Sequence, residues 1–466
     1  MLGLTSRRPA PVGAARLSFS RRNTLGWYGG WYNDPAYADL AAIADFNRDR
    51  YAIPTTPLGS IAGATASELC VKRECTFAEW FAFTASSTTA RSYTDTAGIL
   101  RNDLAVDQPR FDWLNGKRQL ALNGQSTNLI RNITMQGAAT GSPGIVPANW
   151  FVSIPTGCSR TITNIGTFNG VDIIDIRITG AASGGGLSIR PEGSLTQSPA
   201  SPAQAWTFSA FAQVLTDVGG SMTDLRMAIL ALDAGPVQIG ADDGPNQIVA
   251  AQSWSRLQNE YPATPANTAY VLPLITSGTT SWAGKTVDMV LRVGLPQLEQ
   301  SPFMSPVIKT TGSAVTRAIE SARMSPVIEA ILQRSAASVV VRGQNMLRGQ
   351  GTFIGGGASQ ALLRSNTSGF LPVIDGSSSL LGGGSAPAWA ASTFGTFAAF
   401  DAGSRRVGRS GGTDGGDAGT PPSDRGVIYL GRLGTGPTVG DGHYDFVGIA
   451  PSRLSNARLR ELAVPA

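Results

Sequence analysis

The side chains that most often carry catalysis are scarce in this sequence. Histidine occurs once in 466 residues, as His443 in the segment DGHYDF. A histidine can activate a serine, but a hydrolytic triad also needs an aspartate partner and a serine on a tight turn. No G-x-S-x-G elbow joining a strand to a helix is evident. We therefore interpret His443 as a histidine at a strand edge, and we expect a protein that is not an enzyme.

Metal ligands are also thinly spread. The spacing Cys70-x4-Cys75 matches no common zinc pattern, and no histidine lies near it. The glycine-rich segment GRSGGTDGGDAGTPPSD offers Asp414, Asp417 and Asp424 together with backbone carbonyls, which are the oxygen ligands that calcium prefers. A solvated loop is the simpler interpretation of this segment. We expect no required cofactor, with calcium as the open alternative.

Two further kinds of site receive no support from the spacing. The glycine runs SGGGLS, IGGGASQ and LLGGGSA lie between expected strands, so they predict turns and not phosphate-binding loops. Nothing in the spacing of the 32 acidic residues selects a pair for glycoside cleavage. Composition alone leaves such a pair open.

The first 33 residues have the residue types of an interface. The segment TSRRPAPVGAARLSFSRRNTLGWYGGWYN mixes arginines and prolines with aromatic residues and has no apolar periodicity. Aromatic and arginine side chains anchor many protein interfaces, so we predict a docking arm that becomes ordered on a partner. The alternative is an arm folded back on its own domain. The predicted docking residues are Arg7, Arg8, Arg21, Arg22, Trp27, Tyr28, Trp31 and Tyr32.

The composition favours many short strands. Glycine occurs 56 times and proline 28 times, while only 15% of the residues are charged. The net charge of +5 is concentrated in the arm, and basic residues interleaved with aromatics on a folded face are otherwise missing, so we expect no nucleic acid as partner. No apolar run approaches the roughly 20 residues that span a bilayer, so we expect no membrane insertion.

Local signals place the elements. Short strands spaced by Gly, Pro and Ser run from about residue 76 to 299, and the rhythm returns after residue 336. Asn115-Gly116 predicts a hairpin turn. Apolar and polar residues alternate in VDMVLRVGLPQLEQ, which predicts a strand with one face buried and the other exposed to solvent. Asp34-Pro35 predicts a helix to about Tyr51, and Ser325-Pro326 and Ser455 each predict a short helix.

Two stretches together resemble a known family. QPRFDWLNGKRQLALNGQSTNLIRN carries Arg110-Phe111-Asp112 and Thr127-Asn128-Leu129, with Asn123 where the family usually has glutamate. GLPQLEQSPFMSPVIKTTGSAVTR follows about 165 residues later and carries a second set of matching elements. They resemble the sequence motifs at the start and the end of a module found in bacteriophage and prophage tail-fibre and head-spike proteins. The matching elements of the second stretch are Gln297-Leu298-Glu299, Phe303, Ser305-Pro306, Thr310-Thr311-Gly312 and Thr316-Arg317.

The resemblance implies an all-β fold of tandem β-sandwiches. In the family the two motifs flank a jelly roll similar to carbohydrate-binding modules, and a concanavalin-like or laminin-G-like lectin domain often follows. We expect an extended N-terminal docking arm and short helices beside them. The expected domains are 1–75 (arm and short helix), 76–122 (hairpin region leading into the jelly roll), 123–320 (jelly roll), 321–335 (helical linker) and 336–466 (lectin-like domain).

The function that the resemblance implies is adhesion. We expect a virion surface protein, made in the bacterial cytoplasm, that binds host surface polysaccharide, joins other virion proteins through its arm and forms a homotrimer. Trp389 is the first candidate for sugar binding, with Asp414 and Asp417 as hydroxyl or calcium ligands. Trp150, Trp206, Trp254 and Trp282 are expected in cores. The alternatives are a capsule-degrading depolymerase or glycosidase and a purely structural head or baseplate component.

Overall fold

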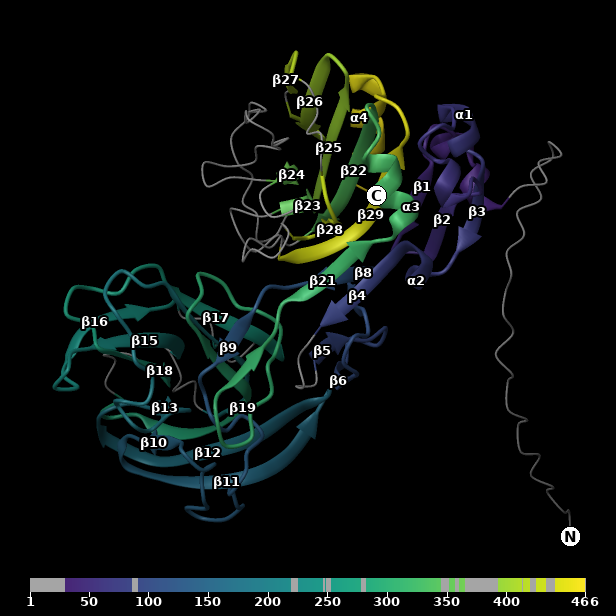
Figure 1. Cartoon of the computed structure of the whole chain (residues 1–466). Helices are drawn as coiled ribbons and strands as arrows, with labels where there is room; N and C mark the ends of the chain where they lie inside the picture. The colour runs from purple at the N-terminus through teal and green to yellow at the C-terminus, as the bar shows by residue number, and fades with distance from the viewer. Residues whose placement is uncertain are drawn as a thin grey trace, which may run out of the picture.

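The chain forms two β-sandwiches (Figure 1). The computed structural model describes residues 30–85, 91–218, 225–245, 248, 253–277, 282–344, 352–356, 360–364, 393–412, 414–419, 425–432 and 441–465. Strands dominate this part of the chain, so the predicted all-β class with tandem sandwiches is confirmed. The two sandwiches do not, however, simply follow one another in sequence.

The first, which we call the composite sandwich, draws its larger sheet from both ends of the chain. The strands of this sheet are β1 (Ala42–Asp45), β2 (Arg50–Pro54), β3 (Lys72–Cys75), β7 (Arg110–Leu114), β8 (Lys117–Leu122), β22 (Ala337–Gln344), β25 (Thr393–Asp401), β26 (Ser404–Arg409), β27 (Gly415–Asp417) and β29 (Gly442–Ala450). Among the described residues the order is β27-β26-β25-β22-β29-β1-β2-β3, and β8 pairs with both β29 and β7. Its centre is thus an N-terminal strand paired with a C-terminal one, with Ile43 opposite Gly448.

The smaller sheet of the composite sandwich is equally mixed. Its strands are β4 (Phe81–Ala85), β21 (Glu320–Met324), β23 (Thr352–Gly356), β24 (Gln360–Arg364) and β28 (Ile428–Leu430), in the order β24-β23-β28-β21-β4. A continuous apolar core lies between the two sheets and includes Trp80, Val339, Phe353 and Val447, all fully buried. Because strands from residues 42–122 supply part of this core, residues 336–466 do not make up the sandwich alone.

The domain plan expected from the sequence differs from this arrangement for a physical reason. The run AIAD of β1 is buried at all four positions, since it lies between β2 and β29. Its apolar spacing also fits one face of a helix, which is why a helix was expected over residues 34–51. That expectation is wrong: Asp34 does accept a hydrogen bond from the Ala36 amide, but only a single 3-10 turn (η2, Pro35–Tyr37) follows, and η1 (Trp31–Asn33) precedes it.

The second sandwich, which we call the inserted sandwich, has two facing five-stranded antiparallel sheets. One contains β11 (Thr156–Phe168), β12 (Val171–Gly184), β14 (Trp206–Asp217), β17 (Ser255–Tyr261) and β19 (Thr286–Glu299), in the order β11-β12-β19-β14-β17. The other contains β10 (Phe151–Ser153), β13 (Ser188–Arg190), β15 (Arg226–Leu232), β16 (Gln238–Asp243) and β18 (Tyr270–Thr276), in the order β10-β13-β18-β15-β16. Both sheets contribute to one apolar core.

Buried and partly exposed side chains alternate along β19, as its sequence predicts. Val287, Met289, Leu291 and Val293 are buried against the second sheet, whereas Asp288 and Arg292 point to the other side and stay partly exposed. The prediction of a strand with one solvent-exposed face is confirmed.

The chain enters and leaves the inserted sandwich at one place. β9 (Ser126–Asn128) pairs with β20 (Val315–Arg317), so the first and last strands of the insertion lie side by side (Figure 1). The hairpin of β5 (Arg91–Thr94) and β6 (Leu100–Leu104) lies against the same junction, and the Leu100 amide donates to the Asn169 carbonyl of the β11–β12 turn.

The short helices lie on the composite sandwich. They are η3 (Leu58–Ser60), α1 (Ala66–Leu69), α2 (Phe77–Trp80), α3 (Pro326–Leu332) and α4 (Asn456–Leu462). The helices expected after Ser325 and at Ser455 are confirmed, and Ser455 Oγ accepts from the Arg458 amide at 3.3 Å. The Asn115-Gly116 hairpin joins β7 to β8, with both residues at positive φ. No described helix is long and apolar enough to cross a membrane.

Candidate functional site

The best candidate site is the face of sheet β11-β12-β19-β14-β17 that points away from the core of the inserted sandwich. We call it the outer face. Because side chains alternate along a strand, the residues between buried core positions on each of these strands all point to this side. The side chains that define it are Asn164 on β11, Phe168 at the end of β11, Asp175 and Arg177 on β12, Phe211 on β14, Trp254 just before β17, and Asp288 and Arg292 on β19.

Three aromatic rings form a cluster on the outer face. Trp254 stacks on Phe211 with centroids 5.5 Å apart, and Phe168 meets Trp254 edge-on at 5.8 Å. Phe168 is 38% exposed, and the other two rings are half-buried. The guanidinium of Arg292 lies 4.8 Å from the centre of the Phe168 ring. The cluster therefore offers exposed aromatic surface held by neighbouring rings and a cation.

Two ion pairs follow along the same strands: Arg292 with Asp175 lies next to the aromatic cluster, and Arg177 with Asp288 lies farther along β12 and β19. Arg292 donates from Nε and Nη2 to both oxygens of Asp175 at 2.7 and 2.8 Å. Asn164 adds a third hydrogen bond to Asp175 at 3.1 Å. Arg177 forms the same two-pronged contact with Asp288, at 2.9 Å for each bond. The pairs join neighbouring strands, because residue 175 lies opposite residue 292 and residue 179 lies opposite residue 288.

Hydrogen bonding favours the charged forms of Arg177, Asp288 and Arg292. The hydrogen bond from Arg177 holds the pKa of Asp288 below its usual value, and the same contact raises the pKa of Arg177. The hydrogen bond to Asp175 likewise raises the pKa of Arg292. The outer face therefore presents donors and acceptors that are held in place by hydrogen bonds on the same sheet as the aromatic rings. This combination suits a ligand with apolar C–H faces and many hydroxyl groups.

Residues of the two family-like stretches meet in a buried junction between the sandwiches. Glu320 accepts hydrogen bonds from Arg91 at 2.9 Å and from Arg110 at 2.9 and 3.2 Å, and it also accepts from the Asn123 amide at 3.0 Å. Arg110 further contacts the side chains of Asn123 and Asp112. Both arginines and Glu320 are almost fully buried. The junction is therefore an ion network removed from solvent.

The closing stretch completes this junction. Glu299 bonds to the hydroxyls of Ser126 and Ser305, and Asn128 accepts from the Leu298 amide at 3.2 Å and donates to the Ile308 carbonyl at 3.1 Å. Arg317 donates to the Pro306 carbonyl at 3.1 Å. These contacts give the motif residues a structural role in attaching the inserted sandwich.

His443 belongs to the same region. Its Nε2 lies 3.0 Å from Asp112 Oδ2, and Asp112 also accepts from Arg110 at 3.0 Å and from the Thr94 amide at 2.8 Å. Burial favours a raised pKa for Asp112, but Arg110 and His443 outweigh it and the pKa lies below its usual value. His443 thus sits at the start of β29, as expected, and contacts a carboxylate that is already engaged by an arginine.

The ligand residues expected from the sequence do not meet on the described surface. Trp389 lies outside the described residues. Asp414 forms an ion pair with Arg460 at 2.9 Å, and Asp417 accepts from Arg405 Nε at 2.8 Å. The hydrogen bond from Arg405 lowers the pKa of Asp417. No group of three or more metal-ligating side chains occurs within the described ranges, so calcium and hydroxyl binding by these aspartates stay predictions.

The docking arm is described only at its end. Arg7, Arg8, Arg21, Arg22, Trp27 and Tyr28 lie outside the described residues. Trp31 donates to Glu74 at 3.2 Å, and both Trp31 and Tyr32 pack against the apolar cluster that covers the outside of the ten-stranded sheet. These two residues therefore contact their own sandwich.

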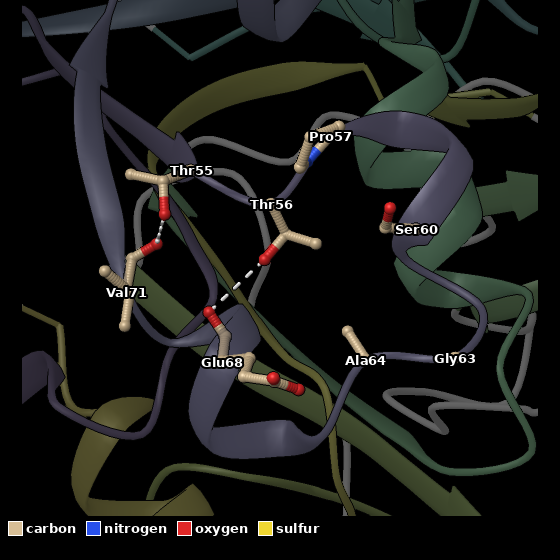
Figure 2. Close-up of a pocket in the computed structure, with 8 residues that line it drawn as sticks. All are labelled: Thr55, Thr56, Pro57, Ser60, Gly63, Ala64, Glu68 and Val71. Atoms are coloured by element: carbon tan, nitrogen blue, oxygen red, sulfur yellow. Dashed lines mark hydrogen bonds between the residues drawn. The ribbon is translucent and has the colours of Figure 1, made fainter.

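A hollow on the composite sandwich is a weaker candidate (Figure 2). It lies between β2, η3 and α1 and is open to solvent. Its two threonine hydroxyls are already used, since Thr55 donates to the Val71 carbonyl at 3.2 Å and Thr56 to the Glu68 carbonyl at 3.4 Å. The capping box of Thr65 also engages the Glu68 carboxylate. We assign this hollow no ligand.

The outer face was missed by reading the sequence. The core prediction holds for Trp150, Trp206 and Trp282, which are at most 6% exposed. Trp254 is half-buried: it packs against the same apolar cluster and stacks on Phe211 of the outer face. A signal was present: Trp254 is in phase with the polar Arg256, Gln258 and Glu260, and Phe211 is out of phase with the buried Phe208, Ala210 and Ala212.

No protein-family model and no curated protein matches the chain. Among solved structures, the CBM22-1 xylan-binding domain of Paenibacillus barcinonensis Xyn10C is 14% identical over 41% of this chain and 98% of that domain, with a TM-score of 0.24. Trypanosoma rangeli sialidase in complex with the inhibitor DANA is 11% identical over 66% of this chain and 62% of the sialidase, with a TM-score of 0.26. A mutant of the same sialidase displaying trans-sialidase activity is 15% identical over 31% of this chain, with a TM-score of 0.24, and this chain spans only 26% of it. At these TM-scores the likenesses carry no argument about what the chain binds.

Proposed function

We propose that this chain is a virion surface adhesin, a fibre or head spike of a tailed phage or a gene-transfer-agent-like particle, that binds host cell-surface glycan. The observation that supports glycan binding is the outer face, which presents three clustered aromatic rings and, on the same sheet, two arginine–aspartate pairs, one of them next to the rings. The virion assignment is supported by the family-like stretches at 110–129 and 297–317.

The geometry suggests how a sugar would bind. One sugar of a glycan chain would lay its C–H face on Phe168 and Trp254, and hydroxyls of a sugar farther along the chain would reach the ion pair of Arg177 and Asp288. One such contact is weak. Several copies of the chain on one particle, as in the expected homotrimer, would multiply modest affinities into firm attachment.

Binding to a panel of polysaccharides and to host cells tests this proposal. We expect retention of the protein by at least one polysaccharide without release of reducing ends. Release of reducing ends that is lost on replacing an acidic pair would establish a depolymerase. Failure to bind any polysaccharide or host cell would favour a purely structural component. Immunogold labelling of particles would place the protein on the head or the tail.

Removal of the arm tests docking separately. Because Trp31 and Tyr32 contact their own sandwich, a variant lacking residues 1–29 removes the remaining predicted docking residues and leaves these contacts in place. We expect this variant to fold and to bind glycan but to be missing from purified particles. Normal incorporation into particles would contradict docking through the arm.

A further inference from the structure

We infer that the outer face selects neutral, hydroxyl-rich glycans over acidic ones; this rests on the proposed glycan binding and specifies its ligand class. The argument begins with charge. Arg177 and Arg292 on β12 and β19 each face a carboxylate within 2.9 Å. The two arginine–aspartate ion pairs on these strands therefore add no net charge to the outer face.

A further cation on this sheet is also engaged. Arg256 on β17 donates to the Ser305 carbonyl at 2.7 Å and to Ser209 Oγ at 2.9 Å. At the edge of the sheet, Lys309 pairs with Asp172 at 2.8 Å. Arg256, which lies on a strand of this sheet, and Lys309, which follows β19 in the chain, thus each have an acceptor from the chain itself. A carboxylate or sulfate on a sugar would have to displace one of them.

The exposed pair fits hydroxyl groups better than anions. Arg177 and Asp288 keep 46% and 33% of their side-chain surfaces exposed. Arg177 uses Nε and Nη2 to hold Asp288, so Nη1 is left without an acceptor among the described residues. Nη1 can donate to one hydroxyl while Asp288 accepts from the next, and a hydroxyl can play either part. A carboxylate only accepts, so Asp288 would repel it.

The inner pair does a different task. Arg292 and Asp175 are only 14% and 5% exposed, and Arg292 lies over the Phe168 ring. This pair holds the Phe168 ring of the aromatic cluster in place and adds no net charge under the ligand. Since the attraction expected at this face is apolar contact and neutral hydrogen bonding, it should depend weakly on salt.

The experiment compares matched probes. Xylan, glucomannan and dextran, each with its carboxymethylated derivative, are immobilised and titrated with the full-length protein at low and high salt. We expect one or more neutral polysaccharides to bind better than their carboxymethylated forms, with affinity changing less than about two-fold between 50 and 500 mM salt. Preference for the carboxymethylated forms with steep salt dependence would overturn the inference and leave glycan binding standing. Binding to none of the six would overturn the inference; the proposed function would then survive only if host cells still bind the protein.

A charge variant sharpens the test. Asp288→Asn frees Arg177 and should raise affinity for the carboxymethylated forms by about two- to five-fold, the size expected for one exposed ion contact. Asp243→Asn is the matched control, because it removes one carboxylate from an ion pair on β16, in the opposite sheet. No gain for Asp288→Asn, or an equal gain for both, would contradict the inference. Thermal unfolding midpoints check that both variants are folded, and the salt titration of the unchanged protein needs neither variant.

Discussion

At the scale of residues, the chain separates two uses of arginine. At the junction, Arg91 and Arg110 are buried and form ion pairs with Glu320, and these ion pairs stabilise the contact between the sandwiches. On the outer face, Arg177 keeps nearly half of its surface in water. The same residue type therefore serves structure at the junction and, in the function we propose, recognition on the outer face, and burial distinguishes the two places.

Replacing Glu320 tests the junction. Glu320→Gln leaves Arg91 and Arg110 buried without their anion, so we expect a loss of about 3–5 kcal/mol in the free energy of unfolding, measured with denaturant at pH 7. Glu461→Gln is the control. Glu461 is 68% exposed and pairs with Arg458, so its replacement should lower the free energy of unfolding by less than about 1 kcal/mol. Equal effects of the two changes would contradict a network that is electrostatically important.

The same carboxyl predicts a pH dependence. Burial favours a raised pKa for Glu320, but Arg110 with Arg317 and Arg91 outweighs it, so the folded-state pKa lies below the usual value. A lowered folded-state pKa stabilises the protein above the unfolded-state pKa, about 4.3, and this contribution is lost as pH falls through the folded-state pKa. Glu320→Gln should therefore flatten the loss of stability below about pH 4.5 in denaturant titrations. An unchanged slope would contradict this assignment.

Reading the sequence could find the strands of the outer face but not the site on it. The alternation of β19 was visible, and it correctly separated Asp288 and Arg292 from the core. What could not be read was which strands are neighbours. Phe168, Phe211 and Trp254 come from three segments far apart in the chain, and only the order β11-β12-β19-β14-β17 brings them together.

At the scale of elements, local signals worked and long-range pairing did not. The Asn115-Gly116 turn and the helix starts at Ser325 and Ser455 depend on neighbouring residues, and all were predictable. The pairing of β1 with β29 joins opposite ends of the chain. Because β1 is short and buried on both sides, its pattern resembled a helix face.

This pairing predicts how fragments behave. A fragment of residues 336–466 lacks β1, β2, β8, β4 and β21, and so it exposes the edges of both sheets and half of the core. We expect no cooperative thermal unfolding from this fragment by circular dichroism, whereas the full chain should unfold cooperatively. A cooperative transition of the isolated fragment would show that the C-terminal strands form an independent domain after all.

At the scale of the whole molecule, a sandwich built from both ends of the chain carries a second sandwich as an insertion (Figure 1). Entry and exit lie side by side at β9 and β20, and the buried ion network braces this crossing. Such an attachment holds the outer face in a defined position relative to the composite sandwich, on which the described chain begins at residue 30. The proposed division is therefore attachment to the particle at one sandwich and host contact at the other.

The most direct test of this account is the affinity of the full-length protein and its Trp254→Ala variant for the neutral polysaccharide that binds best. Removing the ring that contacts both Phe168 and Phe211 should weaken binding by about ten-fold or more, while Trp31→Ala, which removes an aromatic ring from the other sandwich, should leave it unchanged. Equal binding by the unchanged protein and Trp254→Ala, with both folded, would contradict the assignment of glycan binding to the outer face.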